Sequence, residues 1–177
     1  MQNVPSDRDE QAASEGVEVN WQMPEKPATW NSAVTQALDL LANHEPHLGL
    51  VPPEVSMHNI EWAVNEGKTK ASSYLPTFKD AAKHVIHSMP EQDMLDLPAL
   101  LLSRHMKYGK GNIATFEYIG IGVRMHDKLS RLTHANKDVN FTDETVADTR
   151  MDVVGYTVIA IMVEKQWWNL PVQAPLF

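Results

Sequence analysis

Three carboxylate residues stand at intervals of four in the C-terminal part of the sequence: Glu144, Asp148 and Asp152. Each residue of an α-helix turns the chain by about 100°, so this spacing places all three within about 80° of one another. They are expected to form one stripe along a single helix. Neighbouring carboxylates in such a stripe repel one another unless a metal ion or basic side chains neutralise them.

The residues around the acidic stripe indicate which way it points. Its side of the predicted helix also carries small and apolar residues: Met151, Gly155, Val158, Ile159 and Met162. The opposite side carries Val146, Arg150, Val153, Thr157 and Glu164. Because this second set includes an arginine and a glutamate, we expect it to form the outer face, and the acidic stripe to face the interior of the protein.

Two interpretations of an inward acidic stripe remain open. A buried carboxylate is costly unless it is paired or bound to a metal ion. In the first interpretation the stripe binds Mg²⁺, a hard cation that takes oxygen ligands and keeps positions for substrate phosphates. In the second, the acids form salt bridges with Arg124, Lys128 or Arg131 of the preceding predicted helix. The spacing alone fits both equally well.

The elements that would position these residues are all predicted to be helices. Apolar residues recur at helical spacing between proline and glycine breaks, and no strand-like alternation of useful length occurs. We expect an all-α helical bundle with helices at about 32–44 (N-cap Asn31), 53–67, 76–88, 98–107, 114–134 and 143–167 (N-cap Thr142). Residues 1–28 are predicted to be a flexible tail, and 29–177 the helical domain.

Composition restricts the environment and the partners. The 177 residues contain no cysteine and begin with neither a basic nor an apolar segment, so we expect a cytoplasmic protein without a signal peptide. The longest apolar run, 153–163, is too short to span a membrane. It is apolar on all sides, which indicates either a central helix or the interface of a homodimer or homotetramer. The net charge of −8 disfavours binding to a nucleic acid duplex.

A short basic patch is nevertheless present around residues 104–110. Arg104, Lys107 and Lys110 could hold the phosphates of one nucleotide, although they could not follow a long phosphate backbone. His126 is a further candidate for substrate contact, although an ordinary surface position is the more common role for such a histidine.

Two segments closely resemble a known family pattern. RMHDKLSRL at 124–132 and DETVADTRMDVVGY at 143–156 match the pattern R-x-x-D-K-x-x-R-L followed by D-E-x-x-x-D-T-x-x-D-x-x-x-Y. The segment RHMKYGKGN at 104–112 is similar to the K-x-x-D-Y-G-N stretch of the same family. This is the nucleotide modification associated domain family, often found in phages and grouped with the MazG-like all-helical nucleotide pyrophosphohydrolases. The resemblance covers about residues 99–165.

The resemblance implies a four-helix core that binds Mg²⁺, with Mn²⁺ as the alternative ion, between facing helices and hydrolyses nucleoside triphosphates. It implies Asp127, Asp148 and Asp152 as metal ligands, with Glu144 either positioning the attacking water or completing the metal shell. A metal ion held there would bridge phosphate oxygens and lower the pKa of that water. Lys128 and Arg131 would act as catalytic cations on the developing phosphate charge. The substrate-binding residues implied are Arg104, Lys107, Tyr108, Arg124 and His126.

Three hypotheses follow, of which the last is a purely structural helical bundle in which every acid of the stripe is paired or solvated. In the first, the chain hydrolyses a ribo- or deoxyribonucleoside triphosphate to the monophosphate and pyrophosphate, and so controls the nucleotide pool. In the second, it binds or sequesters nucleotides without cleaving them. The E-E-x-x-E cluster of typical MazG-like enzymes is absent, which favours the second hypothesis, whereas the acidic stripe favours the first. For each basic residue, an ion pair with an acid is at least as probable as a phosphate contact.

Overall fold

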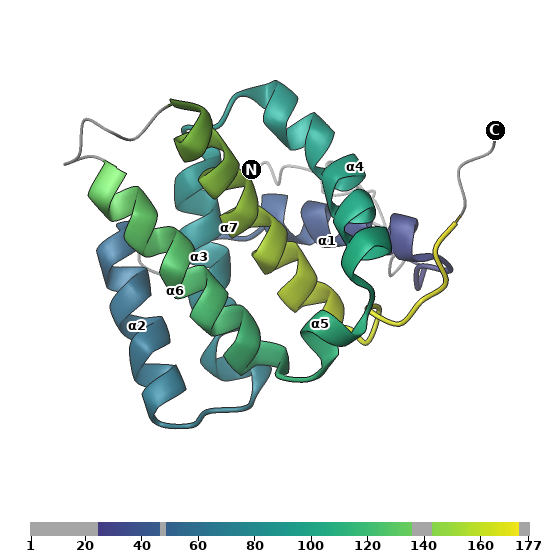
Figure 1. The fold of residues 1–177 in the computed structure, drawn as a ribbon, viewed down its shortest axis with the longest axis horizontal. Helices are drawn as coiled ribbons and strands as arrows, with labels where there is room; N and C mark the ends of the chain where they lie inside the picture. Colours follow the sequence, from purple (N-terminus) through teal and green to yellow (C-terminus); the bar gives the residue numbers. More distant parts are fainter. Residues whose placement is uncertain (1–24, 47–48, 136–142, 174–177) are drawn as a thin grey trace, which may run out of the picture.

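The structure is a computed structural model that describes residues 25–46, 49–135 and 143–173. This part of the chain is all-helical, as predicted, and contains no strand. Figure 1 shows the arrangement. The elements are α1 (Trp30–Ala42), α2 (Pro53–Asn65), a short 3₁₀ helix η1 (Ala71–Ser73), α3 (Leu75–Ile86), α4 (Glu91–Tyr108), α5 (Gly111–Ala114), α6 (Glu117–Ala135) and α7 (Asp143–Glu164).

Helix α7 forms the centre of the domain. It packs against α6, α3, α1 and α4, and Figure 1 shows it between α6 and α4. Val154, Val158 and Met162 are fully buried along it. This central position accounts for a helix that is apolar on all sides, without requiring a second copy of the chain.

One face of α7 differs from the prediction. Val153 and Thr157, expected on the outer face, are both fully buried. The Thr157 hydroxyl donates hydrogen bonds to the backbone oxygens of Phe78 (3.1 Å) and Val153 (3.0 Å). The prediction was wrong because α3 covers this side of α7, and a threonine whose hydroxyl is satisfied by backbone oxygens can be buried.

The helix boundaries show which local signals were decisive. Helix α2 begins at the predicted Pro53, and α7 begins at the predicted Asp143, although its predicted N-cap, Thr142, lies outside the described residues. Helix α1 begins two residues earlier than expected, because Thr29 and Ser32 form a capping box. Asn31, the predicted N-cap, instead accepts a hydrogen bond from the backbone N–H of Gln173.

Two further helices differ from their predicted limits. Helix α4 begins at Glu91, so Pro98 lies inside it rather than at its start. The helix predicted to start at 114 begins at Glu117 as α6, and the short helix α5 precedes it; the backbone at Glu117 has a positive φ of 39° that separates the two. None of the helices in the described ranges is both long and apolar enough to cross a membrane.

The two ends of the described chain are joined beside α4. The backbone N–H of Trp30, at the start of α1, donates to the Pro171 oxygen at 2.8 Å. The Trp168 indole N–H donates to the Lys110 oxygen at 3.2 Å, and the Lys110 ammonium donates to the Asn169 oxygen at 3.0 Å. These contacts hold Trp30 and Trp168 against the C-terminal end of α4, where the candidate site lies.

Candidate functional site

A pocket of about 340 Å³ lies between α4, α5 and α7. Helix α5 connects the C-terminal end of α4 to α6, close to the C-terminal end of α7 (Figure 1). Aromatic, apolar and charged side chains share the wall: Trp30, Leu101, Arg104, His105, Tyr108, Gly109, Asn112, Ile113, Asp152, Gly155, Tyr156, Ile159 and Trp168. Such a mixture of apolar surface and a few polar groups is typical of small-molecule sites.

Gly155 permits the close approach of α4 and α7 at this pocket. A Cβ atom at this position would lie 3.1 Å from Leu101 Cδ2 and 3.8 Å from Leu97 Cδ1. Any larger residue would therefore displace leucine side chains of α4. The small residue on the acidic side of α7, which the sequence pattern correctly placed there, sets the spacing of the two helices beside the pocket.

The polar part of the pocket is built around one carboxylate. Asp152 Oδ2 lies 3.0 Å from the Lys128 ammonium of α6, and Asp152 Oδ1 accepts a hydrogen bond from the Arg104 guanidinium of α4. The exposed fractions of the side chains are 13% for Asp152, 18% for Lys128 and 41% for Arg104. Two cations therefore share one anion at the pocket, which leaves one positive charge uncompensated within the cluster.

The other predicted metal ligands do not join Asp152. Asp127 pairs with Arg131 at 3.2 Å on the surface of α6, where both side chains are about half exposed. Asp148 is exposed, so the prediction that it faces the interior was wrong. One turn later along α7, Arg104 of α4 and Lys128 of α6 both pair with Asp152. Glu144 belongs to α7, but its side chain lies outside the described part.

A metal centre of three protein ligands is not assembled among the described residues. No three His, Asp or Glu side chains in the described ranges lie close enough to hold one ion. Asp127, Asp148 and Asp152 therefore do not form the expected cluster, and the partners of Asp152 are cations. At Asp152, the structure therefore agrees with the second interpretation of the acidic stripe, in which the acids form salt bridges.

The predicted substrate-binding residues are divided among three places. Arg104 and Tyr108 line the pocket, and the Lys107 ammonium lies 5.3 Å from the centre of the exposed Tyr108 ring. Arg124 donates to the Asn112 side-chain oxygen at 2.8 Å, which links α6 to the segment bordering the pocket. His126 lines a different hollow, between α2 and α6.

An aromatic wall was not predicted. The rings of Trp30 and His105 stack with centroids 4.5 Å apart, and the Trp168 ring meets His105 edge-on at 4.8 Å. Burial lowers the pKa of His105, and the nearby Lys110 ammonium lowers this pKa further. Trp30 Nε1 and His105 Nδ1 are buried without a hydrogen-bond partner in the described part. The only signal in the sequence was the position of the two tryptophans near predicted helix ends.

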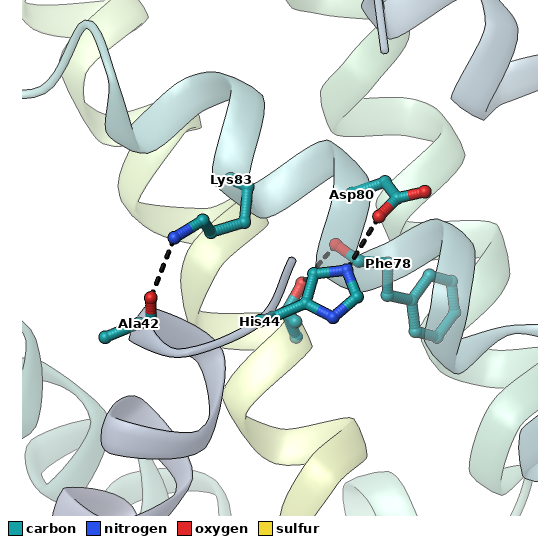
Figure 2. Close-up of polar contacts among 6 residues, drawn as sticks. Ala42, His44, Phe78, Asp80 and Lys83 are labelled. Carbon is teal, nitrogen blue, oxygen red and sulfur yellow. Dashed lines mark hydrogen bonds and ion pairs between the residues drawn. The ribbon is translucent and has the colours of Figure 1, made fainter. Parts of the chain in front are cut away.

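A second polar cluster lies away from this pocket, between the end of α1 and α3 (Figure 2). His44 Nε2 lies 2.7 Å from Asp80 Oδ1, and the two side chains are only 12% and 11% exposed. The Lys83 ammonium donates to the Ala42 oxygen at 2.8 Å, at the C-terminal end of α1, where a cation is favourable. None of these residues lines the pocket between α4 and α7.

Comparisons with protein-family models, with curated proteins and with solved structures were made for the whole chain. No match was found in any of them. The functional assignment therefore depends on the motif resemblance and on the geometry of the pocket.

Proposed function

We propose that the chain binds a ribo- or deoxyribonucleoside triphosphate in the pocket between α4 and α7. The observation that carries this proposal is the sharing of one carboxylate by Arg104 and Lys128 beside an aromatic-lined pocket. The uncompensated positive charge attracts an anion, and the guanidinium geometry suits phosphate oxygens. The aromatic rings offer flat surfaces for a base or sugar.

The three segments that carry the family resemblance meet at this cluster. Arg104 belongs to RHMKYGKGN, Lys128 to RMHDKLSRL, and Asp152 to the motif that ends at Tyr156. The ion pairs bring these segments together although Arg104 and Asp152 are 48 residues apart in the chain. A shared motif whose separate parts meet at a carboxylate that lines the pocket supports a ligand-binding role for that pocket.

The division of roles within the pocket follows from exposure and position. Arg104, whose side chain is 41% exposed, can reach a phosphate from solvent. The exposed Lys107 follows it on α4, about one helical turn further along. Tyr108 and Tyr156 flank the pocket and are placed to contact the base or sugar. The volume, about 340 Å³, is within the range of roughly 300–1,000 Å³ typical of small-molecule sites.

Calorimetric titration of the full chain with the common ribo- and deoxyribonucleoside triphosphates tests this proposal. We expect saturable binding of at least one triphosphate, and about tenfold weaker binding in Arg104→Gln because a charge-assisted phosphate contact is lost. Lys83→Gln is the matched control, since it removes an ammonium that donates to the Ala42 oxygen and does not line the pocket. The absence of binding to every triphosphate, or equal losses in the two variants, would refute the proposal.

Hydrolysis of the bound triphosphate is a second candidate function. The observation in its favour is the pair Asp148 and Asp152, one helical turn apart on α7, of which Asp148 is exposed and has no ion-pair partner in the described part. The described residues do not, however, assemble a Mg²⁺ or Mn²⁺ site, because no three suitable side chains converge. We therefore derive no metal-assisted step, and hydrolysis remains a proposal that requires further ligands.

A direct assay separates the two candidates. The wild-type chain is incubated with each triphosphate and Mg²⁺, and pyrophosphate and monophosphate are measured. Hydrolysis predicts release of pyrophosphate that falls about a hundredfold in Asp148→Asn, since the loss of a metal ligand removes several kcal/mol of transition-state stabilisation. Binding of a triphosphate without release of pyrophosphate or monophosphate supports the sequestering function and excludes hydrolysis.

The assembly and cellular location remain proposals of the same kind. We propose a homodimer or homotetramer in the cytoplasm, or in the host cytoplasm if the gene belongs to a phage. The central position of α7 means that this helix need not supply the interface. Sedimentation equilibrium of the full chain tests the oligomeric state, and a monomer over the whole concentration range would refute it.

A further inference from the structure

We infer that Asp152 is an internal competitor for the phosphate site: its carboxylate, held in place by Lys128, occupies the Arg104 guanidinium until a ligand phosphate takes over that contact. This inference rests on the proposed nucleotide binding and assigns Asp152 a role opposite to that of a metal ligand. The residue then lowers the affinity of the site for phosphate instead of contributing to it.

Both oxygens of the carboxylate are engaged by the two cations. Asp152 Oδ1 accepts from the Arg104 guanidinium, and Oδ2 lies 3.0 Å from the Lys128 ammonium. A phosphate group requires the same kind of donors, and of the two cations Arg104 is the one that lines the pocket. Carboxylate and phosphate oxygens therefore compete for the Arg104 guanidinium.

The exposure of the three side chains indicates how the exchange proceeds. Asp152 and Lys128 are largely buried, whereas Arg104 is 41% exposed at the pocket. Arg104 is therefore the cation that an entering phosphate meets first. When Arg104 turns to the ligand, Asp152 keeps Lys128 as its partner, so the buried carboxylate is never left without a compensating charge.

Removal of the carboxylate charge provides the test, because the two roles of Asp152 predict opposite signs. Binding of tripolyphosphate and of ATP to the full chain is measured by calorimetry in EDTA, for wild type and Asp152→Asn. We expect Asp152→Asn to bind tripolyphosphate about tenfold more tightly than wild type, since an ion pair no longer has to be broken. The additional substitution Arg104→Gln is expected to abolish this gain.

Glu164→Gln is the matched control on the same helix. Glu164 forms an ion pair with Lys165 at 3.4 Å and does not line the pocket, so this substitution changes the net charge equally without releasing Arg104. The affinity of the Glu164→Gln variant for tripolyphosphate is expected to stay within about twofold of the wild-type affinity. If Asp152→Asn does not fold, as judged by circular dichroism, Asp152→Ser removes the same charge with a smaller side chain.

The possible outcomes separate this inference from the proposed function. Tighter binding of tripolyphosphate in Asp152→Asn, without tighter binding in Glu164→Gln, supports the inference. If wild type binds ATP and tripolyphosphate, and Asp152→Asn binds them equally or more weakly, the inference is overturned and the proposed nucleotide binding is not affected. Equal gains in the Asp152 and Glu164 variants also overturn it, because they show an effect of net charge. If neither wild type nor variant binds ATP or tripolyphosphate, both the proposed function and the inference fail.

Discussion

Two largely buried carboxylates of this protein have very different surroundings. Asp80 is paired with His44 between the end of α1 and α3, and neither residue lines the pocket between α4 and α7. Asp152 lies at that pocket and is shared by two cations from two other helices. Burial of an acid is similar in the two places, but only the second combines access to a ligand with an excess of positive charge. Burial alone is therefore a poor guide to a functional acid.

The largest effect on stability is expected at the first cluster. Asp80→Ala removes a partner from a pair whose side chains are about one-tenth exposed, and so leaves His44 without this buried acceptor. We expect the free energy of unfolding to fall by about 2–3 kcal/mol, measured by urea denaturation. Triphosphate binding by the folded variant is expected to be unchanged.

The exposed Asp39 of α1 provides the control for this substitution. Asp39→Ala is expected to change the free energy of unfolding by less than about 0.5 kcal/mol. If Asp80→Ala were equally mild, the pair with His44 would be dispensable. If it weakened nucleotide binding in the folded protein, the proposed separation of the two clusters would be wrong.

A smaller loss of stability is expected at the second cluster. Asp152→Asn keeps the size of the side chain and an oxygen that can accept a hydrogen bond, and Arg104 is already 41% exposed. We expect the free energy of unfolding to fall by about 1 kcal/mol, less than for Asp80→Ala, because solvent screens the partly exposed pair. Urea denaturation of both variants under identical conditions makes the comparison, and a greater loss in Asp152→Asn would reverse it.

The smallest effect concerns pH and the aromatic wall. Burial, together with Lys110, lowers the pKa of His105 from the ordinary value of 6.5, so the unfolded chain takes up the proton more readily than the folded chain. The stabilisation is present above about pH 6.5 and decreases as the pH falls below that value. In His105→Phe, which keeps an aromatic ring beside Trp30, the loss of stability on acidification is expected to be smaller than in wild type. Identical pH dependence of unfolding in the two proteins would contradict this assignment.

Local signals in the sequence predicted most of the helices. Proline at the start of α2, the capping pattern before α7 and the apolar spacing of α6 depend on nearby residues only. The early start of α4 and the break at Glu117 were missed. A proline inside a helix and a single residue with positive φ are tolerated only because of the surrounding packing.

The candidate site was predicted in its residue types but not in its contacts. Arg104, Lys128 and Asp152 were all identified as functional candidates, yet their mutual ion pairs depend on how α4, α6 and α7 pack. The same dependence explains why Asp148 is exposed one turn away from Asp152. Trp30 and Trp168 reach the pocket from opposite ends of the chain, and no periodic pattern links residues so distant in sequence.

The central claim is that a triphosphate binds between α4 and α7, and amide chemical-shift mapping tests it most directly. The ¹⁵N-labelled full chain is titrated with the triphosphate that binds most tightly in calorimetry, and shift changes are assigned along the sequence. The account predicts that the largest changes fall in Arg104–Asn112 and Asp152–Ile159, with little change around His44 and Asp80. Changes concentrated around α2 and α3, or no saturable change for any triphosphate, would contradict it.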